Sequence, residues 1–177
     1  MSIPCKLMEH IILHHLSQSL DNFLHNRQHG FRKGLSCETQ LCGTYHDIAR
    51  CVDRGDSHTV HAVVMDFAKA FDKVPHQLLM GKLSRVSNIN SKILMWIHDL
   101  SSERRLKVVV AQSQSLETFV TLGVPQGSML GSSLFLIYIN DLSNHVICKL
   151  SLFADDTLMY RRLIQLLIVE KSLLLKN

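Results

Sequence analysis

The chain has 177 residues, of which 46% are hydrophobic and 19% charged, and its formal net charge is +4. This length and apolar content allow one domain with a substantial core and exclude a disordered chain. Five cysteines without a Cys-x-x-Cys spacing argue against a disulfide framework. The mildly basic charge is compatible with a phosphate-bearing partner but does not establish one.

The first third of the chain predicts two helices joined by a basic loop. An apolar residue every four positions predicts an amphipathic helix over residues 6–24 (Met8, Ile12, Leu16, Leu20, Leu24). Its charged and histidine residues interrupt any secretory signal, so the expected location is intracellular, in either nucleus or cytoplasm. After the loop, Ser36 is placed to cap a second helix that ends at Gly55.

The middle of the chain predicts a strand at 60–66, a short helix from Pro75 to Val86 and another helix over 91–101. Two strands, Lys107–Ala111 and Leu116–Leu122, are expected to pair around a polar turn at 112–115. Beyond them, Pro125 favours a loop, and a helix is expected from Ser128 to Asp141–Leu142. Its apolar run, 134–139, is far too short to cross a membrane.

Two adjacent aspartates, Asp155 and Asp156, are flanked by apolar residues, which favours a strand–turn–strand hairpin. A carboxylate pair on an apolar hairpin requires a compensating cation, and a divalent metal is the simplest one. A third carboxylate, Asp66, ends the strand predicted at 60–66. Three carboxylates on two strand ends could form a two-metal site for phosphoryl transfer. Taken alone, an Asp-Asp pair is more often a solvated turn, and a single strand-end aspartate is more often a cap.

Four blocks in order resemble the reverse transcriptases of non-LTR (LINE-type) retrotransposons, in particular the jockey and chicken-repeat groups. The blocks are Arg27–Gly34 (RQHGFRKG), Met65–His76 (MDFAKAFDKVPH), Gly123–Gly131 (GVPQGSMLG) with its continuation to Leu142, and Phe153–Thr157 (FADDT). The resemblance extends from residue 1 to about residue 160. It favours this family over a group II intron-type maturase, which shares the catalytic aspartates.

The resemblance implies a role for individual residues. Asp66, Asp155 and Asp156 correspond to the catalytic aspartates, and the carbonyl of Phe67 assists in holding metal. Phe71 corresponds to the steric gate against a ribose 2′-hydroxyl; its alternative reading is a core residue of a short helix.

The remaining site residues belong to two other blocks. Gln126 and Gly127 are expected to contact the incoming nucleotide, whereas Arg32 and Lys33 are expected to contact nucleic acid. The implied cofactor is a pair of Mg²⁺ ions, with Mn²⁺ as an alternative. The implied partners are an RNA template, a DNA primer and dNTPs.

The implied fold is an α+β polymerase palm with partial fingers, the right-hand reverse transcriptase fold, and with the thumb absent. Residues 1–162 form the expected reverse transcriptase domain, divided into partial fingers (1–58) and palm (59–162). The tail at 163–177 does not follow the family pattern, and out-of-frame translation of a decayed, truncated copy is our hypothesis for it. Such a copy is expected to have weak or no polymerase activity, or to survive as a remnant that at most binds nucleic acid.

Overall fold

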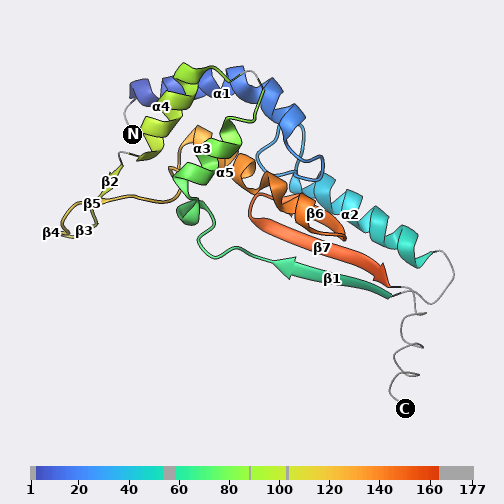
Figure 1. Cartoon of the computed structure of the whole chain (residues 1–177). Coiled ribbons are helices and arrows are strands. Elements are labelled where there is room, and N and C mark those ends of the chain that lie inside the picture. The colour runs from blue at the N-terminus through green and yellow to red at the C-terminus, as the bar shows by residue number, and fades with distance from the viewer. Residues whose placement is uncertain (1–2, 54–58, 88, 103, 164–177) are drawn as a thin grey trace, which may run out of the picture. The chain divides into compact units, whose positions relative to one another are not determined.

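The computed structural model describes residues 3–53, 59–87, 89–102 and 104–163 (Figure 1). The chain forms two compact units. Unit 1 consists of Met1–His25 and Ala68–Leu142, and unit 2 of Asn26–Phe67 and Ser143–Asn177. Each unit is therefore built from segments that are distant in the sequence. The 163–177 tail hypothesis falls almost entirely on residues outside those described.

Unit 1 is organised around α5, a helix that is apolar on nearly every side. Its elements are α1 (Ile3–Phe23), η1 (Phe71–Lys73), α3 (His76–Leu83), α4 (Ser91–Ser102) and α5 (Met129–Ile139), with η2 (Asn140–His145) following α5. α5 packs against α1, α3 and η1, and α3 also packs against α4. A helix apolar all round must be buried on all sides, which explains its central place.

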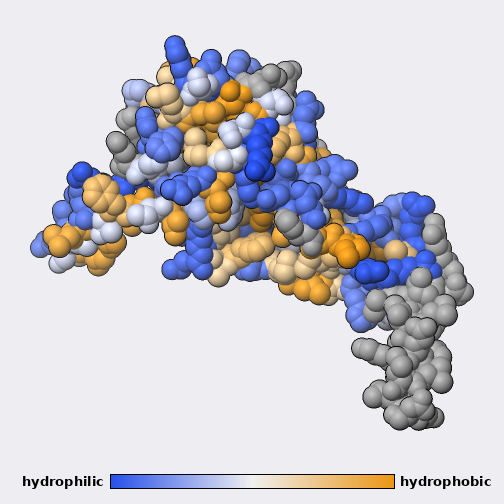
Figure 2. Space-filling view, in the orientation of Figure 1, coloured by the Kyte–Doolittle hydropathy of each residue, from blue (hydrophilic) through white to orange (hydrophobic). Residues whose placement is uncertain are grey.

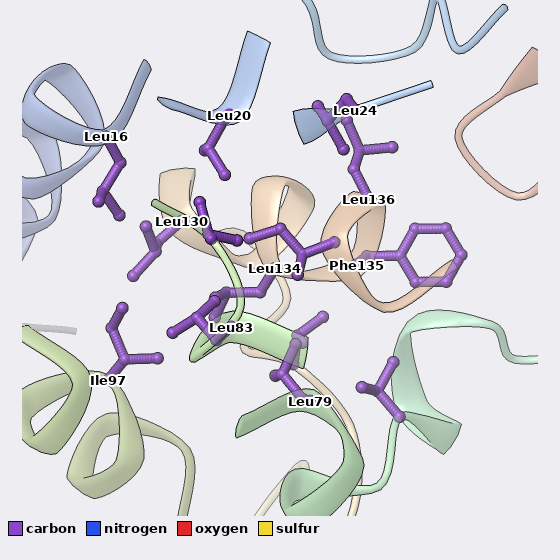
Figure 3. Packing of buried hydrophobic residues seen from close by; sticks show 14 of the residues in the cluster. Leu16, Leu20, Leu24, Leu79, Leu83, Ile97, Leu130, Leu134, Phe135 and Leu136 are labelled. Atoms are coloured by element: carbon purple, nitrogen blue, oxygen red, sulfur yellow. The ribbon is translucent and has the colours of Figure 1, made fainter. Parts of the chain in front are cut away.

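The core of unit 1 confirms most of the predicted stripe on the first helix. Four of its five members are buried, namely Ile12, Leu16, Leu20 and Leu24, and they belong to the same buried cluster as Leu130 and Leu134 of α5. Figure 3 labels all of these residues except Ile12. Met8 is the exception, with 45% of its surface exposed. Its neighbour Glu9 is buried instead, and the Glu9 Oε2 accepts a hydrogen bond from the Met129 backbone N–H at 3.0 Å. A carboxylate at the first turn of α5 favours that helix through its dipole.

A β-ribbon extends between α4 and α5 in the sequence. β2 (Arg105–Leu106) pairs with β5 (Thr118–Phe119), and β3 (Val109–Val110) pairs with β4 (Ser113–Gln114). The hairpin was predicted, but the turn was placed wrongly at 112–115. Ala111 adopts a positive φ of 53°, so the chain reverses at Ala111–Gln112 and the polar Ser113–Gln114 becomes a strand. Apolar side chains remain on its surface, including Val110 and Phe119 (Figure 2).

Unit 2 is a helix on a three-stranded antiparallel sheet. α2 (Cys37–Val52) covers β1 (Thr59–Met65), β6 (Lys149–Phe153) and β7 (Asp156–Leu163), which lie in the order β1-β7-β6. The predicted cap is confirmed, because Ser36 and Thr39 form a reciprocal capping box. The helix ends at Val52, earlier than predicted, and Gly55 lies outside the described residues.

Polar contacts join α2 to the sheet. The Asp47 carboxylate accepts hydrogen bonds from Arg27 Nη2 and Tyr160 Oη, both at 2.8 Å, and pairs with Lys149 Nζ at 3.2 Å. Burial opposes ionisation of Asp47, but these donors outweigh it and lower the pKa of Asp47 to about 2. Burial, together with the Asp47 charge, raises the pKa of Tyr160 to about 12. The buried hydroxyls of Thr44 and Ser151 add a hydrogen bond of 2.8 Å.

All five cysteines, each within the described ranges, carry free thiols. Among the described residues, no helix combines the length and apolar content that crossing a bilayer requires.

Leu134→Ala is expected to reduce the free energy of unfolding by about 2–5 kcal/mol, because it removes a fully buried side chain and leaves a cavity beside α1 and α3. Urea denaturation measures the change. Met95→Ala is the matched control, since Met95 is 67% exposed on α4 and should cost well under half as much. Equal losses for the two variants would contradict a core centred on α5.

Asp47→Asn is expected to cost about 1–2 kcal/mol at pH 7, because Arg27, Lys149 and Tyr160 lose a charged acceptor. The ordinary Asp pKa is 3.8 and the folded value is about 2, so the stabilisation is present above pH 3.8 and is lost as pH falls towards 2. The difference between wild type and variant should therefore shrink between pH 4 and pH 2. Glu117→Gln, at an exposed ion pair, should show no such trend.

Candidate active site

The three carboxylates predicted to be catalytic are carried at one end of the sheet in unit 2. The β6–β7 hairpin turns through Ala154 and Asp155, and Asp156 is the first residue of β7, opposite Phe153. Asp66 directly follows β1, whose last residue, Met65, pairs with Thr157. Asp66 itself lies one residue beyond the paired register, at the same end of the β1–β7 pair as Asp156.

The environment of these positions is polar and open. Asp66 and Asp156 are exposed, Asp155 is half-buried, and Phe67 is 36% exposed. Among the described residues, no three His, Cys, Asp or Glu side chains converge closely enough to form a metal site. The donor set that the backbone brings together is nevertheless all oxygen, which suits Mg²⁺ or Mn²⁺ rather than a thiol- or imidazole-preferring metal.

The turn that carries Asp155 is held by the side chain of Gln28. This side chain is 2% exposed, and its Oε1 accepts hydrogen bonds from the backbone N–H of Ala154 at 3.0 Å and of Gly30 at 2.9 Å. Its Nε2 donates to the Ala154 carbonyl at 3.4 Å. Ala154 has a positive φ of 55°, which is unfavourable for a residue with a Cβ. Gln28 therefore fixes a strained turn immediately before the aspartates.

Gly30 permits this clamp because it lies against the same turn. A Cβ at position 30 would overlap the backbone nitrogen of Ala154. The backbone around it also pairs with β6, since His29 N–H donates to the Leu152 carbonyl at 2.9 Å. Sequence reasoning treated RQHGFRKG as a nucleic-acid-contacting loop and missed Gln28 and Gly30. A glycine beside a buried amide was the available signal, because glycine often marks a close backbone approach.

The basic residues of this loop have different surroundings. Arg27 is occupied by Asp47, as described above. Arg32 is half-buried, and its Nη1 donates to the Gln28 carbonyl at 3.4 Å, whereas Lys33 is exposed. The loop thus contributes to the architecture of unit 2 through Arg27 and Arg32, and it presents Lys33 to solvent.

Residues predicted to bind nucleotide lie together in unit 1. The Val124 N–H donates to the Phe71 carbonyl at 2.8 Å, and Gln126 Nε2 donates to Asp72 Oδ1 at 2.9 Å. The half-buried Phe71 ring stacks on Phe135, with ring centroids 4.4 Å apart. Phe71 is therefore both anchored to the core, as its alternative reading required, and adjacent to the chain segment that precedes Gln126.

The loop before Gln126 is held from several directions. Gly123 has a φ of +87°, and a Cβ there would lie 2.8 Å from the backbone of Asp72. Its carbonyl accepts a hydrogen bond from Arg104 and lies 2.9 Å from His76 Nε2. Burial lowers the pKa of the Arg104 guanidinium, partly offset by the charge of Asp72. Arg104 thus holds this loop in place through the Gly123 carbonyl.

A sequence model of the family "Reverse transcriptase (RNA-dependent DNA polymerase)" matches residues 1–169. This covers most of the chain, and the chain therefore belongs to the reverse transcriptase family. Its fold is accordingly of the reverse transcriptase class, with mixed helices and sheet. Reverse transcriptases generally use divalent metal ions and bind an RNA template with a primer.

The chain is also similar to polymerases of Drosophila melanogaster transposons. It is 31% identical to a probable RNA-directed DNA polymerase from transposon BS over 139 residues, which cover 77% of this chain and 15% of that protein. It is 27% identical over 164 residues to the RNA-directed DNA polymerase from mobile element jockey, covering 86% of this chain and 17% of that protein. The chain thus spans less than a fifth of the length of these relatives. These similarities agree with the jockey-like, LINE-type resemblance of the four sequence blocks.

Gly30→Ala is expected to destabilise the chain by about 1–3 kcal/mol, because its methyl group would displace the Ala154 turn. Gly43→Ala is the matched control: this position lies within α2, has no atom within 4 Å of the added Cβ, and should gain up to about 1 kcal/mol. Urea denaturation of both variants measures the effects. The proposed close approach is wrong if Gly30→Ala is as stable as Gly43→Ala.

Proposed function

We propose that this chain carries the polymerase centre of a non-LTR retrotransposon RNA-directed DNA polymerase, which adds dNTPs to a DNA primer on an RNA template. The observation that carries the proposal is the register of unit 2, which brings Asp66, Asp155 and Asp156 to one end of one sheet. Membership of the reverse transcriptase family supports the same chemistry. Because the relatives are much longer, the activity of the whole protein is part of this proposal.

Asp66 and Asp155, with the carbonyl of Phe67, are the proposed ligands of two Mg²⁺ ions, and Asp156 completes the acidic set. Such ions, when bound, lower the pKa of the primer 3′-hydroxyl and neutralise charge on the leaving pyrophosphate. The exposed side chains of Asp66 and Asp156 can change rotamer without disturbing packing, which allows the carboxylates to converge. Gln28 keeps Asp155 in register with them by holding the turn.

Phe71, Gln126 and Gly127 are the proposed nucleotide-binding residues. Phe71 suits a steric gate because its stacking on Phe135 restricts the ring, and a rigid wall discriminates better than a mobile one. Gly127 has a φ of +74°, a conformation that glycine adopts without strain, so its backbone can approach a ligand closely. Arg32 and Lys33 are the proposed contacts to nucleic acid, of which Lys33 is the more accessible.

In terms of the right-hand polymerase fold, we propose that residues 59–162 form the palm and residues 1–58 part of the fingers. The antiparallel sheet with acidic residues at one hairpin supports the first assignment. This functional division differs from the division into two compact units, because α1 belongs to unit 1.

Asp155→Asn is expected to reduce Mg²⁺-dependent primer extension on an RNA template by at least about a hundredfold, because a ligand for the catalytic ions is removed. Incorporation of labelled dNTP by the purified 177-residue chain measures it. Asp99→Asn, at a 73% exposed side chain in unit 1, is the matched control and should retain activity.

A second measurement tests metal binding independently of polymerase activity. Mg²⁺ at 100 times its dissociation constant should raise the free energy of unfolding of the wild type by about 2.7 kcal/mol, and Asp155→Asn should lose most of that gain. Metal stabilisation that is identical in both proteins would place the ion elsewhere and refute the proposed ligands.

A further inference from the structure

A cavity of about 240 Å³ lies in unit 2 between α2 and the sheet. It is lined by Asp47, Arg50, Cys51, Lys149 and Arg162. The three α2 residues are spaced i, i+3 and i+4, so they share one face of the helix. On the sheet, Lys149 is opposite Tyr160, and Arg162 is two residues beyond Tyr160, so both strand residues point to the α2 side.

The charges in this cavity are unbalanced. Its lining contains three cations and one carboxylate. That carboxylate, Asp47, is already paired with Lys149 and with Arg27 from outside the lining. Among the described residues, neither Arg50 nor Arg162 forms an ion pair. The C-terminal end of α2 contributes only about half a negative charge, too little to balance them.

Arg162 provides a second, independent observation. Its Nε is buried and makes no hydrogen bond to any described residue. A buried guanidinium N–H is normally satisfied, so this one indicates an acceptor other than the described residues. The guanidinium fork matches the oxygens of a phosphate group.

We infer that Arg50, Lys149 and Arg162 form a binding pocket for a phosphate group, separate from the carboxylate end of the sheet. The volume is below that of pockets for drug-sized ligands, which suits a phosphate or pyrophosphate group rather than a whole nucleotide. Arg162 is six residues along β7 from Asp156, about 20 Å at the usual rise of a strand. That span corresponds to about six nucleotide steps of one strand. The phosphate can therefore come from a nucleic-acid backbone, an assignment that rests on the proposed function, or from a small free phosphate compound.

Cys51 supplies a probe within the cavity, and exposed Cys37 at the other end of α2 supplies an internal reference. The experiment measures iodoacetamide labelling of both thiols by peptide mass spectrometry, in metal-free buffer. Inorganic pyrophosphate at ten times its dissociation constant should slow labelling of Cys51 about tenfold relative to Cys37. Arg162→Gln should abolish this protection, as should Arg50→Gln, whose exposed side chain can be replaced without disturbing the fold. Absence of protection in folded wild-type protein overturns the inference.

Arg161→Gln is the matched control, because Arg161 is exposed, has the same charge and points to the opposite face of β7. This variant should retain full protection of Cys51. A loss of protection equal to that of Arg162→Gln would overturn the inference, because it would show that net charge, and not the pocket, attracts pyrophosphate.

An RNA–DNA hybrid distinguishes the sources of the phosphate. If the backbone is the ligand, the hybrid protects Cys51, and Arg162→Gln lowers the slope of log affinity against log salt by about 0.9. If pyrophosphate protects Cys51 and the hybrid does not, the phosphate pocket is supported but its assignment to a nucleic-acid backbone is overturned. Asp155→Asn should leave Cys51 protection intact, so failure of the polymerase proposal and failure of this one give different results.

Discussion

The arrangement of the acidic hairpin depends on one buried side chain, the amide of Gln28. A turn with a positive φ at Ala154 is unfavourable by itself, and the two adjacent aspartates that follow it repel each other. Gln28 satisfies both the N–H and the C=O of Ala154, so the turn is held at the point where it is weakest. An amide suits this task because it offers a donor and acceptors on one neutral group, which can be buried without the cost of a charge.

The same clamp joins two parts of the chain that are far apart in sequence. Residues 26–67 supply Gln28, α2 and β1, whereas residues 143–163 supply β6 and β7. The first part contributes a single strand, β1, which pairs only with β7 among the described strands, whereas β6 and β7 form a hairpin within the second part. Asp66 of the first part therefore reaches the sheet end that carries Asp155 and Asp156 only when unit 2 folds. The geometry of the site therefore depends on the cooperative folding of unit 2.

Sequence periodicity predicted the helices well and the polar details poorly. The four-residue repeat of α1 and the Ser36 cap depend on local spacing, which a single sequence displays directly. By contrast, Glu9 is buried because the N–H of Met129, 120 residues away, requires an acceptor. The burial of Gln28 is likewise explained only by its hydrogen bonds to Ala154, 126 residues away. The register of β1 with β7 also depends on such pairing, although the two strands themselves could be read locally. The position of the β-ribbon turn was predicted wrongly for a different reason. The turn depends on a positive φ at Ala111, and a sequence signals a positive φ only through glycine, asparagine or aspartate.

The sheet of unit 2 carries opposite charges at its two ends, and this polarity limits how a polyanion can lie on it. At the Asp155 end, carboxylates repel phosphates, so a phosphate can approach only together with compensating cations. At the Arg162 end, the surplus of cations attracts phosphates directly, and Asp47 reduces that surplus while fixing Lys149 in place. A phosphate group is attracted to the Arg162 end without a metal ion, whereas it needs a metal ion to approach the Asp155 end. If both proposals hold, binding of a chain of phosphates and the metal-dependent chemistry have separate ionic requirements on a single sheet.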